Sequence, residues 1–128
     1  MRNSILLALA FGLTLPLTAA AEMLNYTCSY TEASYTAPFQ SAASIRKCPE
    51  GKCTYAISID GGVGSVNGVS GFSVDSNEQS ITLQRTAKDP VMGGLDTTVI
   101  TISKSDMSFE SRKTTTPSVT LTTRGQCQ

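Results

Sequence analysis

The sequence predicts a small all-β domain, an antiparallel meander of about seven or eight strands closed as a barrel or a two-sheet sandwich and stapled by disulfides. Three observations predict this class: short segments in which apolar and polar residues alternate, turn-forming residues between them, and four cysteines. The chain has 128 residues, which is enough for one domain and too few for two of ordinary size. A meander hides its strand edges most easily by curling upon itself.

The first 21 residues have the pattern of a secretory signal peptide. The second residue is basic, residues 5–17 are apolar, and a run of small residues ends at Ala21. This pattern predicts cleavage between Ala21 and Glu22. An uncleaved membrane anchor is the less favoured alternative, because the apolar run is much shorter than the roughly 20 residues that a span needs. We therefore expect a periplasmic or secreted protein in which residues 22–128 form a single β domain.

All four cysteines lie in this domain, and an even number of cysteines in an oxidising compartment indicates disulfides. Residues 48–53 contain Pro and Gly where a type I turn favours them, and such a turn brings its two ends together. The favoured pairing is Cys48 with Cys53 and Cys28 with Cys127, while the other two connectivities stay open. A zinc site is the alternative, but Cys28 and Cys127 lack the matching spacing and the chain has no His.

The alternating segments predict the individual strands. In residues 53–60, Tyr55, Ile57 and Ile59 alternate with mostly polar residues, which gives the strand one dry face. The same pattern recurs at residues 72–74, 80–86 and 97–104, around Met107 and Phe109, and around Val119 and Leu121. The secondary structure of residues 32–47 is left undecided, because Pro38 interrupts any strand there. An edge strand and one or two helical turns are the two alternatives.

The connections between these segments contain turn-forming residues. Asn67 and Gly68 stand between two valines, which is the strongest short hairpin signal in the chain. Ser105 and Asp106 are expected to form a two-residue turn. Longer connections are expected at residues 75–78, 88–94 and 114–117.

Composition excludes several classes of function. Ten basic and ten acidic residues leave no net charge, so the basic footprint of a nucleic-acid binder is missing. The absence of His excludes a Ser–His–Asp triad, and cysteines held in disulfides provide no thiolate nucleophile. We therefore expect a protein that is not an enzyme, with no catalytic residues, no metal and no cofactor.

Three local patterns suggest chemistry, and each has a simpler structural explanation. The glycines of residues 61–71 do not have the spacing of a phosphate-binding loop and are better explained by tight bends. Ser44 and Lys47 match the Ser-x-x-Lys of penicillin-interacting enzymes, but Pro49 ends any helix that would hold them together. Residues 75–78 contain calcium-type oxygens without the rest of a dedicated loop.

An aromatic cluster near the start of the predicted domain is the candidate binding surface. It consists of Tyr26, Tyr30, Tyr35 and Phe39. Such rings fit two roles: they plug one end of a small barrel, or they form a recognition patch for a protein or a glycan.

An exported chain of this length that opens with Tyr-Thr-Cys at residues 26–28 and closes with Gly-Gln-Cys at residues 125–127 is similar in outline to the periplasmic lysozyme inhibitors. The resemblance implies a small β-barrel that inserts a loop into the active cleft of an attacking enzyme. The Ser-Gly-x-x-Tyr loop of that class is matched only at Ser70 and Gly71, with Val74 in place of the Tyr. We therefore transfer no functional residue from it.

The function is predicted at the level of class. We expect an exported, non-enzymatic β protein of the bacterial envelope that binds a protein partner, and inhibition of an envelope-attacking enzyme is one form of this hypothesis. The alternative is a small-ligand- or glycan-binding periplasmic protein that uses the aromatic cluster. No nucleic acid is expected as a partner, and no membrane span is expected after cleavage.

Overall fold

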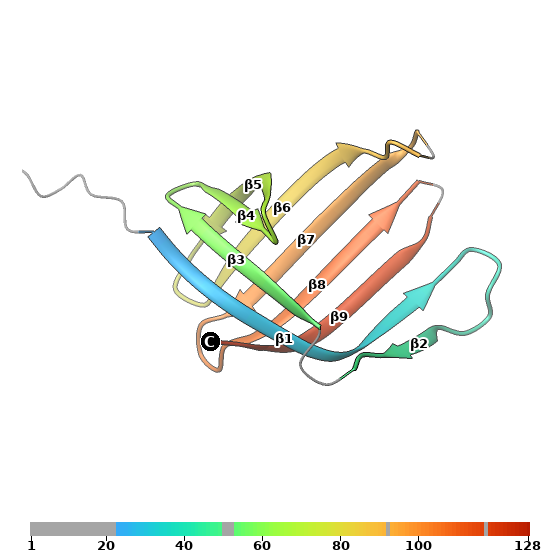
Figure 1. Ribbon diagram of the computed structural model, residues 1–128, viewed down its shortest axis with the longest axis horizontal. Coiled ribbons are helices and arrows are strands. Elements are labelled where there is room, and N and C mark those ends of the chain that lie inside the picture. The colour runs from blue at the N-terminus through green and yellow to red at the C-terminus, as the bar shows by residue number, and fades with distance from the viewer. Residues whose placement is uncertain (1–22, 50–52, 92, 117) are drawn as a thin grey trace, which may run out of the picture.

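The computed structural model describes residues 23–49, 53–91, 93–116 and 118–128, which form an all-β fold (Figure 1). The predicted signal peptide and its cleavage site between Ala21 and Glu22 lie outside the described residues. The described residues form nine strands: β1 (Met23–Thr36), β2 (Ser44–Lys47), β3 (Thr54–Asp60), β4 (Val63–Val66), β5 (Val69–Ser76), β6 (Ser80–Lys88), β7 (Leu95–Ser103), β8 (Ser108–Thr115) and β9 (Thr120–Cys127). The described ranges contain no helix with the length and apolarity that crossing a membrane requires.

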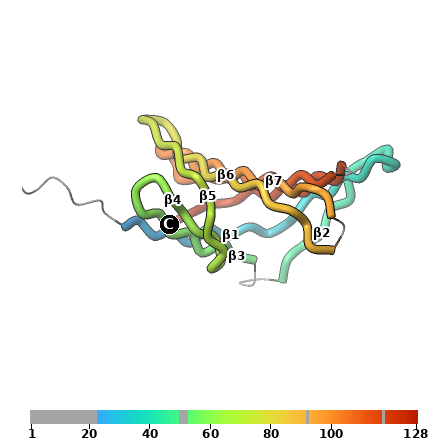
Figure 2. Tube along the Cα trace, turned by 90° about the horizontal axis from the view of Figure 1, so that it is seen from above, coloured from blue at the N-terminus to red at the C-terminus, as the bar shows by residue number. Residues whose placement is uncertain are grey.

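Eight of the strands close into an antiparallel barrel, which confirms the predicted fold class and selects the barrel. The pairing runs from β1 through β3 to β9 in chain order, and β9 pairs back with β1. The remaining strand, β2, pairs with β1 outside this ring. The barrel is flattened, so that β6 and β7 lie above β1 and β3 in Figure 2.

The long strand β1 belongs to two regions of the molecule. Its residues 23–29 pair with β3, and its residues 32–35 pair with β2, so that β2 and β3 lie end to end along one edge of it. The pairing with β9 shifts between Tyr30 and Ala33, which marks a bulge at the junction. Beyond this bulge β6 to β9 extend past the shorter strands β3, β4 and β5 (Figure 1). We call this end of the barrel, where β6 to β9 extend past the shorter strands, the mouth.

Both predicted disulfides are present, Cys28–Cys127 and Cys48–Cys53. Cys28 lies directly opposite Cys127 in the β1–β9 pairing, so this bond joins the first and last strands where the barrel closes. The other disulfide connects the end of β2 to the start of β3, although the predicted turn itself falls at residues 50–52, outside the described residues.

The Asn67–Gly68 hairpin prediction is confirmed. Val66 pairs with Val69, and both turn residues have positive φ angles, 50° for Asn67 and 81° for Gly68, as a type I′ turn requires. The backbone N–H of Asn67 donates to the carbonyl of Ala56 at 2.8 Å, and the Asn67 Oδ1 accepts from the Ala56 N–H at 2.8 Å. The hairpin tip is thereby fixed against β3.

The predicted two-residue turn at Ser105 and Asp106 is wrong. Four residues, 104–107, connect β7 to β8, and Met107 adopts a φ of 60°. The backbone N–H and the hydroxyl of Ser108 donate to the Asp106 carboxylate and lower the pKa of that carboxyl. These two hydrogen bonds to the Asp106 carboxylate hold the four-residue loop in place. The sequence pattern alone did not indicate the length of this loop.

Residues 32–47, whose secondary structure the sequence left undecided, contain the end of β1 and the edge strand β2. β1 continues to Thr36, and β2 adds an edge strand of four residues with no helical turn in the described part of this segment. Ala37 and Pro38 lie in the connection between the two strands, as the proline predicted.

Candidate functional site

Side chains that face the barrel interior form three transverse rows across β6, β7, β8 and β9. The deepest row is Ile81, Ile102, Phe109 and Gly125; the middle row is Leu83, Ile100, Ser111 and Thr123; the row at the mouth is Arg85, Thr98, Lys113 and Leu121. Neighbours in each row are paired residues of adjacent strands, whose side chains lie on one face of the sheet. The interior surface therefore changes from apolar to polar to cationic toward the mouth.

A cavity of about 340 Å³ opens at the mouth between these rows and the strands that face them. Its apolar walls include Tyr55 from β3, Phe72 from β5 and Leu121 from β9. Arg85, Thr98 and Lys113 contribute polar atoms to its lining. Most of the cavity surface is thus apolar, with a few polar groups in defined places.

Two buried hydroxyl residues lie at the bottom of the mouth. Ser111 lines the cavity and is only 4% exposed, and Thr123 beside it is 2% exposed. The Thr123 hydroxyl lies 3.4 Å from the hydroxyl of Tyr55. This contact is a hydrogen bond, so the buried Thr123 hydroxyl avoids the cost of about 1–3 kcal/mol that an unpaired one would carry.

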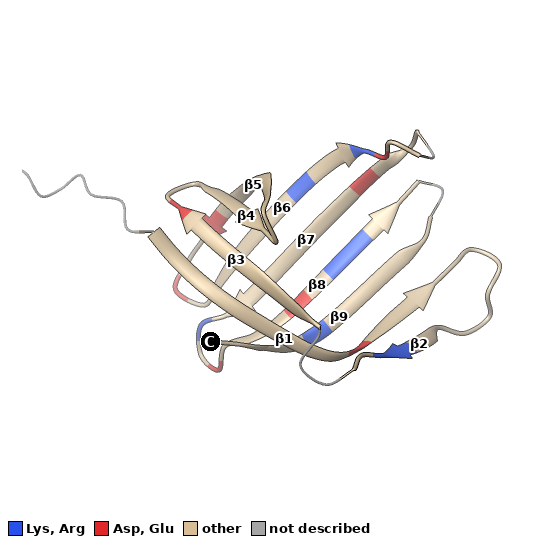
Figure 3. Ribbon diagram, in the orientation of Figure 1, with Lys and Arg blue, Asp and Glu red and all other residues tan. Residues whose placement is uncertain are grey.

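An acidic side chain, Asp96 of β7, lies one inward-facing position beyond the mouth row and close to its Lys113. Figure 3 shows a basic position on β6, an acidic one on β7 and a basic stretch on β8 side by side. The Lys113 ammonium pairs with the Asp96 carboxylate at 3.7 Å. The other oxygen of Asp96, Oδ1, is buried and accepts no hydrogen bond from the described residues.

Arg85 is half-buried and forms no ion pair with any carboxylate of the described residues. Its side chain runs along Gly71, where an added Cβ would lie 3.4 Å from the Arg85 Nε. Gly71 has a φ of +93°, a conformation that favours glycine. The glycine thus leaves room for a guanidinium that lies at the cavity and has no counter-ion there.

The four residues of the predicted aromatic cluster are not brought together. Tyr26 and Tyr30 pack against the core, Tyr35 lies opposite Leu121 at the edge of the mouth, and Phe39 is 99% exposed in the β1–β2 connection. Tyr30 instead stacks on Tyr55, with ring centroids 5.3 Å apart.

Burial, together with the neighbouring Tyr55, raises the pKa of the Tyr30 hydroxyl above its ordinary value of 10.0. The folded chain therefore favours the neutral phenol more strongly than the unfolded chain does. This contribution to stability is present below pH 10.0 and is lost as the pH rises through the higher folded value.

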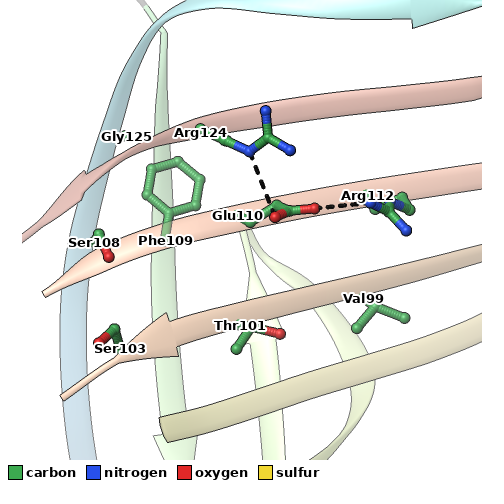
Figure 4. Close-up of a pocket in the computed structure, with 9 residues that line it drawn as sticks. All are labelled: Val99, Thr101, Ser103, Ser108, Phe109, Glu110, Arg112, Arg124 and Gly125. Carbon is green, nitrogen blue, oxygen red and sulfur yellow. Dashed lines mark hydrogen bonds and ion pairs between the residues drawn. The ribbon is translucent and has the colours of Figure 1, made fainter.

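A second groove lies on the outer face of β7, β8 and β9, with a volume of about 570 Å³ (Figure 4). Glu110 occupies its centre and forms ion pairs with Arg112 at 3.1 Å and Arg124 at 3.5 Å. The side chains of Arg112 and Arg124 are each more than half exposed, and exposed ion pairs are screened by water and salt. The outer groove therefore has paired, solvated charges, whereas the mouth has an unpaired and half-buried one.

Sequence reasoning missed the mouth. A signal for it was present in the sequence: the inward-facing positions of three strands change from apolar to charged along the strand. These positions are Ile81, Leu83 and Arg85 on β6; Ile102, Ile100 and Asp96 on β7; and Phe109, Ser111 and Lys113 on β8. Ser70 and Gly71, which match part of the inhibitor loop, lie within β5.

Comparison of the chain with protein-family models, with curated proteins and with solved structures finds no match. Within the described ranges, no group of three or more His, Cys, Asp or Glu side chains is placed to hold a metal ion.

Proposed function

We propose that the protein is an exported, non-enzymatic binding protein of the bacterial envelope that holds a small ligand with an apolar body in the mouth of its barrel. The cavity between Tyr55, Phe72 and Leu121 is the observation that supports this function. Ligand sites in soluble proteins are concave and mostly apolar, with a few placed polar groups and volumes of about 300–1,000 Å³. The mouth has each of these properties.

The buried hydroxyls support the same function. Ser111 and Thr123 face the interior in a row whose other members, Leu83 and Ile100, are fully buried aliphatic residues. The small side chain of Ser111, which lines the cavity, leaves space and a hydroxyl at its bottom, where a larger apolar side chain would fill it. Two disulfides hold the surrounding strands, and a preformed site binds with less ordering of side chains.

A neutral probe tests this function. N-phenyl-1-naphthylamine fluoresces when it leaves water, and we expect its fluorescence to saturate at one probe per chain. Thr98→Phe places a ring in the mouth and is expected to weaken binding at least about tenfold, or about 1.4 kcal/mol. Competition by lipids and oligosaccharides then separates an apolar ligand from a glycan.

Thr101→Phe is the matched control, because Thr101 lies on the same strand, lines the outer groove and faces away from the mouth. Its probe affinity should equal that of the unchanged protein. Fluorescence that never saturates, or an equal loss of affinity in both variants, would contradict a site at the mouth.

Recognition of a protein partner is the second candidate function, and the β1–β2 extension favours it. Phe39 is 99% exposed, Ile45 on β2 is 61% exposed, and no strand of the described ranges pairs with the free edge of β2. Exposed apolar side chains and free strand edges are typical of protein interfaces. Inhibition of an envelope-attacking enzyme would be one form of this function.

A pull-down from periplasmic extract tests the second candidate. The mature protein should retain a stoichiometric partner that the variant Phe39→Ser/Ile45→Ser does not retain. The absence of any partner at micromolar concentration, or equal capture by the variant, would count against it.

A further inference from the structure

We infer that the mouth selects apolar ligands that carry a carboxylate, and that Arg85 is the residue that binds this carboxylate. The inference rests on the proposed function, because it names the ligand class of the same site. It follows from the charges of the mouth row, from the position of Arg85 above an apolar cavity, and from the geometry of the guanidinium.

One positive charge of the mouth row has no ion-pair partner among the residues that the structure describes. Lys113 is paired with Asp96, whereas Arg85 forms no ion pair with the described carboxylates. Removing a charge from water is unfavourable unless an opposite charge or hydrogen bonds compensate it. A ligand with a single negative charge would supply that compensation for the half-buried guanidinium.

The neighbours of Arg85 favour a carboxylate attached to an apolar body. Thr98 lies opposite Arg85 in the β6–β7 pairing, and its hydroxyl can donate to an oxygen bound there. A guanidinium presents its N–H groups in a planar fork that matches the two oxygens of a carboxylate. Ile100 lies deeper in the cavity, in the middle row, and Phe72 lines the same cavity, so a ligand held at Arg85 would place its apolar part against them.

Lys113 is the other cation of the row, and the structure gives it a different role. Its side chain is 47% exposed and already contacts Asp96. A ligand carboxylate at Lys113 would compete with that internal partner, whereas at Arg85 it would displace none of the described carboxylates. We therefore assign recognition of the carboxylate to Arg85. Lys113 is expected to add only a long-range electrostatic attraction to the affinity for the ligand.

The experiment compares decanoate with decanol, which have chains of equal length and differ in charge. Each is used to displace N-phenyl-1-naphthylamine from the full mature protein at neutral pH. Decanoate is expected to displace the probe at about tenfold lower concentration than decanol, since a charge-assisted hydrogen bond is roughly twice as strong as one between neutral groups. The advantage should shrink as salt is added, because salt screens partly exposed charges.

Arg85→Gln should abolish this preference, and Arg85→Lys should retain part of it. Arg112→Gln is the matched control, since Arg112 is next to Lys113 on β8 but lines the outer groove. The control should keep the full preference. Urea denaturation of each variant establishes that the barrel is folded, and each variant's own affinity for the neutral probe is the reference for its displacement curves.

The outcomes separate this inference from the proposed function. If decanol displaces the probe as well as decanoate does, the mouth binds ligands but the carboxylate selection is wrong. If the preference survives in Arg85→Gln, the assignment of Arg85 is wrong. If the probe does not bind at all, the proposed function fails together with the inference.

Discussion

Replacing Cys28 and Cys127 together by alanine is expected to lower the free energy of unfolding by about 4–5 kcal/mol, the largest effect of any change considered for this protein. The two residues are 99 positions apart in the sequence, so their bond removes much conformational entropy from the unfolded chain. They also lie opposite each other where β9 pairs with β1. Without the bond, the barrel closes through backbone hydrogen bonds and side-chain packing alone.

Urea denaturation of the mature domain under oxidising conditions measures this effect. The double variant Cys48→Ala/Cys53→Ala is the matched control, because that disulfide closes a sequence separation of only 5 and should contribute about 2 kcal/mol in the same loop-entropy treatment. Equal losses in the two double variants would show that the closure of the barrel does not depend on the long-range disulfide as described.

Leu83→Ala is expected to lower the free energy of unfolding by about 3–4 kcal/mol, because it removes a large side chain that is 0% exposed and leaves a cavity. Leu83 packs over Gly64: a Cβ added at Gly64 would lie 2.9 Å from the Leu83 Cδ2. Gly64→Ala alone should therefore cost about 1–3 kcal/mol through overpacking. Combined with Leu83→Ala it should cost less, because the nearest methyl group is gone and only Val74 Cγ2 at 3.1 Å and Ser58 O at 3.3 Å stay close.

A double-mutant cycle on the two residues tests this packing. The loss of unfolding free energy in the double variant should be smaller than the sum of the two single losses by at least about 0.5 kcal/mol, as for residues in direct contact. Leu95→Ala is the matched leucine control, since Leu95 is 55% exposed and should change stability by less than about 0.5 kcal/mol. Additive losses at Leu83 and Gly64 would mean that the two residues do not share one packed space.

Local patterns were sufficient to predict β3, β6 and β7 and the tightest turn, but they did not predict the long strand β1. The alternation at Tyr55, Ile57 and Ile59 reports which face of β3 is buried, because side chains of a strand alternate between the two faces of a sheet. Asn67 and Gly68 favour a type I′ turn through their own backbone preferences. Both features depend on residues close in the sequence, and both are confirmed.

The mouth could not be predicted in the same way, because it depends on register. Arg85, Thr98 and Lys113 come from three strands and form one row only through the pairings of β6, β7 and β8. The alternation of a single strand shows that Arg85 and Lys113 face the barrel interior. It does not show at which end of the barrel they lie or that they lie close together.

The four aromatic residues show a different limit of sequence reasoning, because closeness in the sequence does not make them close in space. Tyr26 and Tyr35 both belong to β1, and a strand rises about 3.3 Å per residue. Side chains nine positions apart are therefore roughly 30 Å apart along an extended strand. The ring that stacks on Tyr30 is Tyr55 from the neighbouring strand β3.

Amide chemical shifts during a decanoate titration test most directly whether the mouth is the binding site. With uniformly labelled mature protein, the largest shifts are expected at Phe72, Thr98 and Ser111, and they should follow one saturable curve. Shifts confined to β2 and Phe39, or gathered around Arg124 on the outer face, would contradict the account and place recognition elsewhere on the barrel.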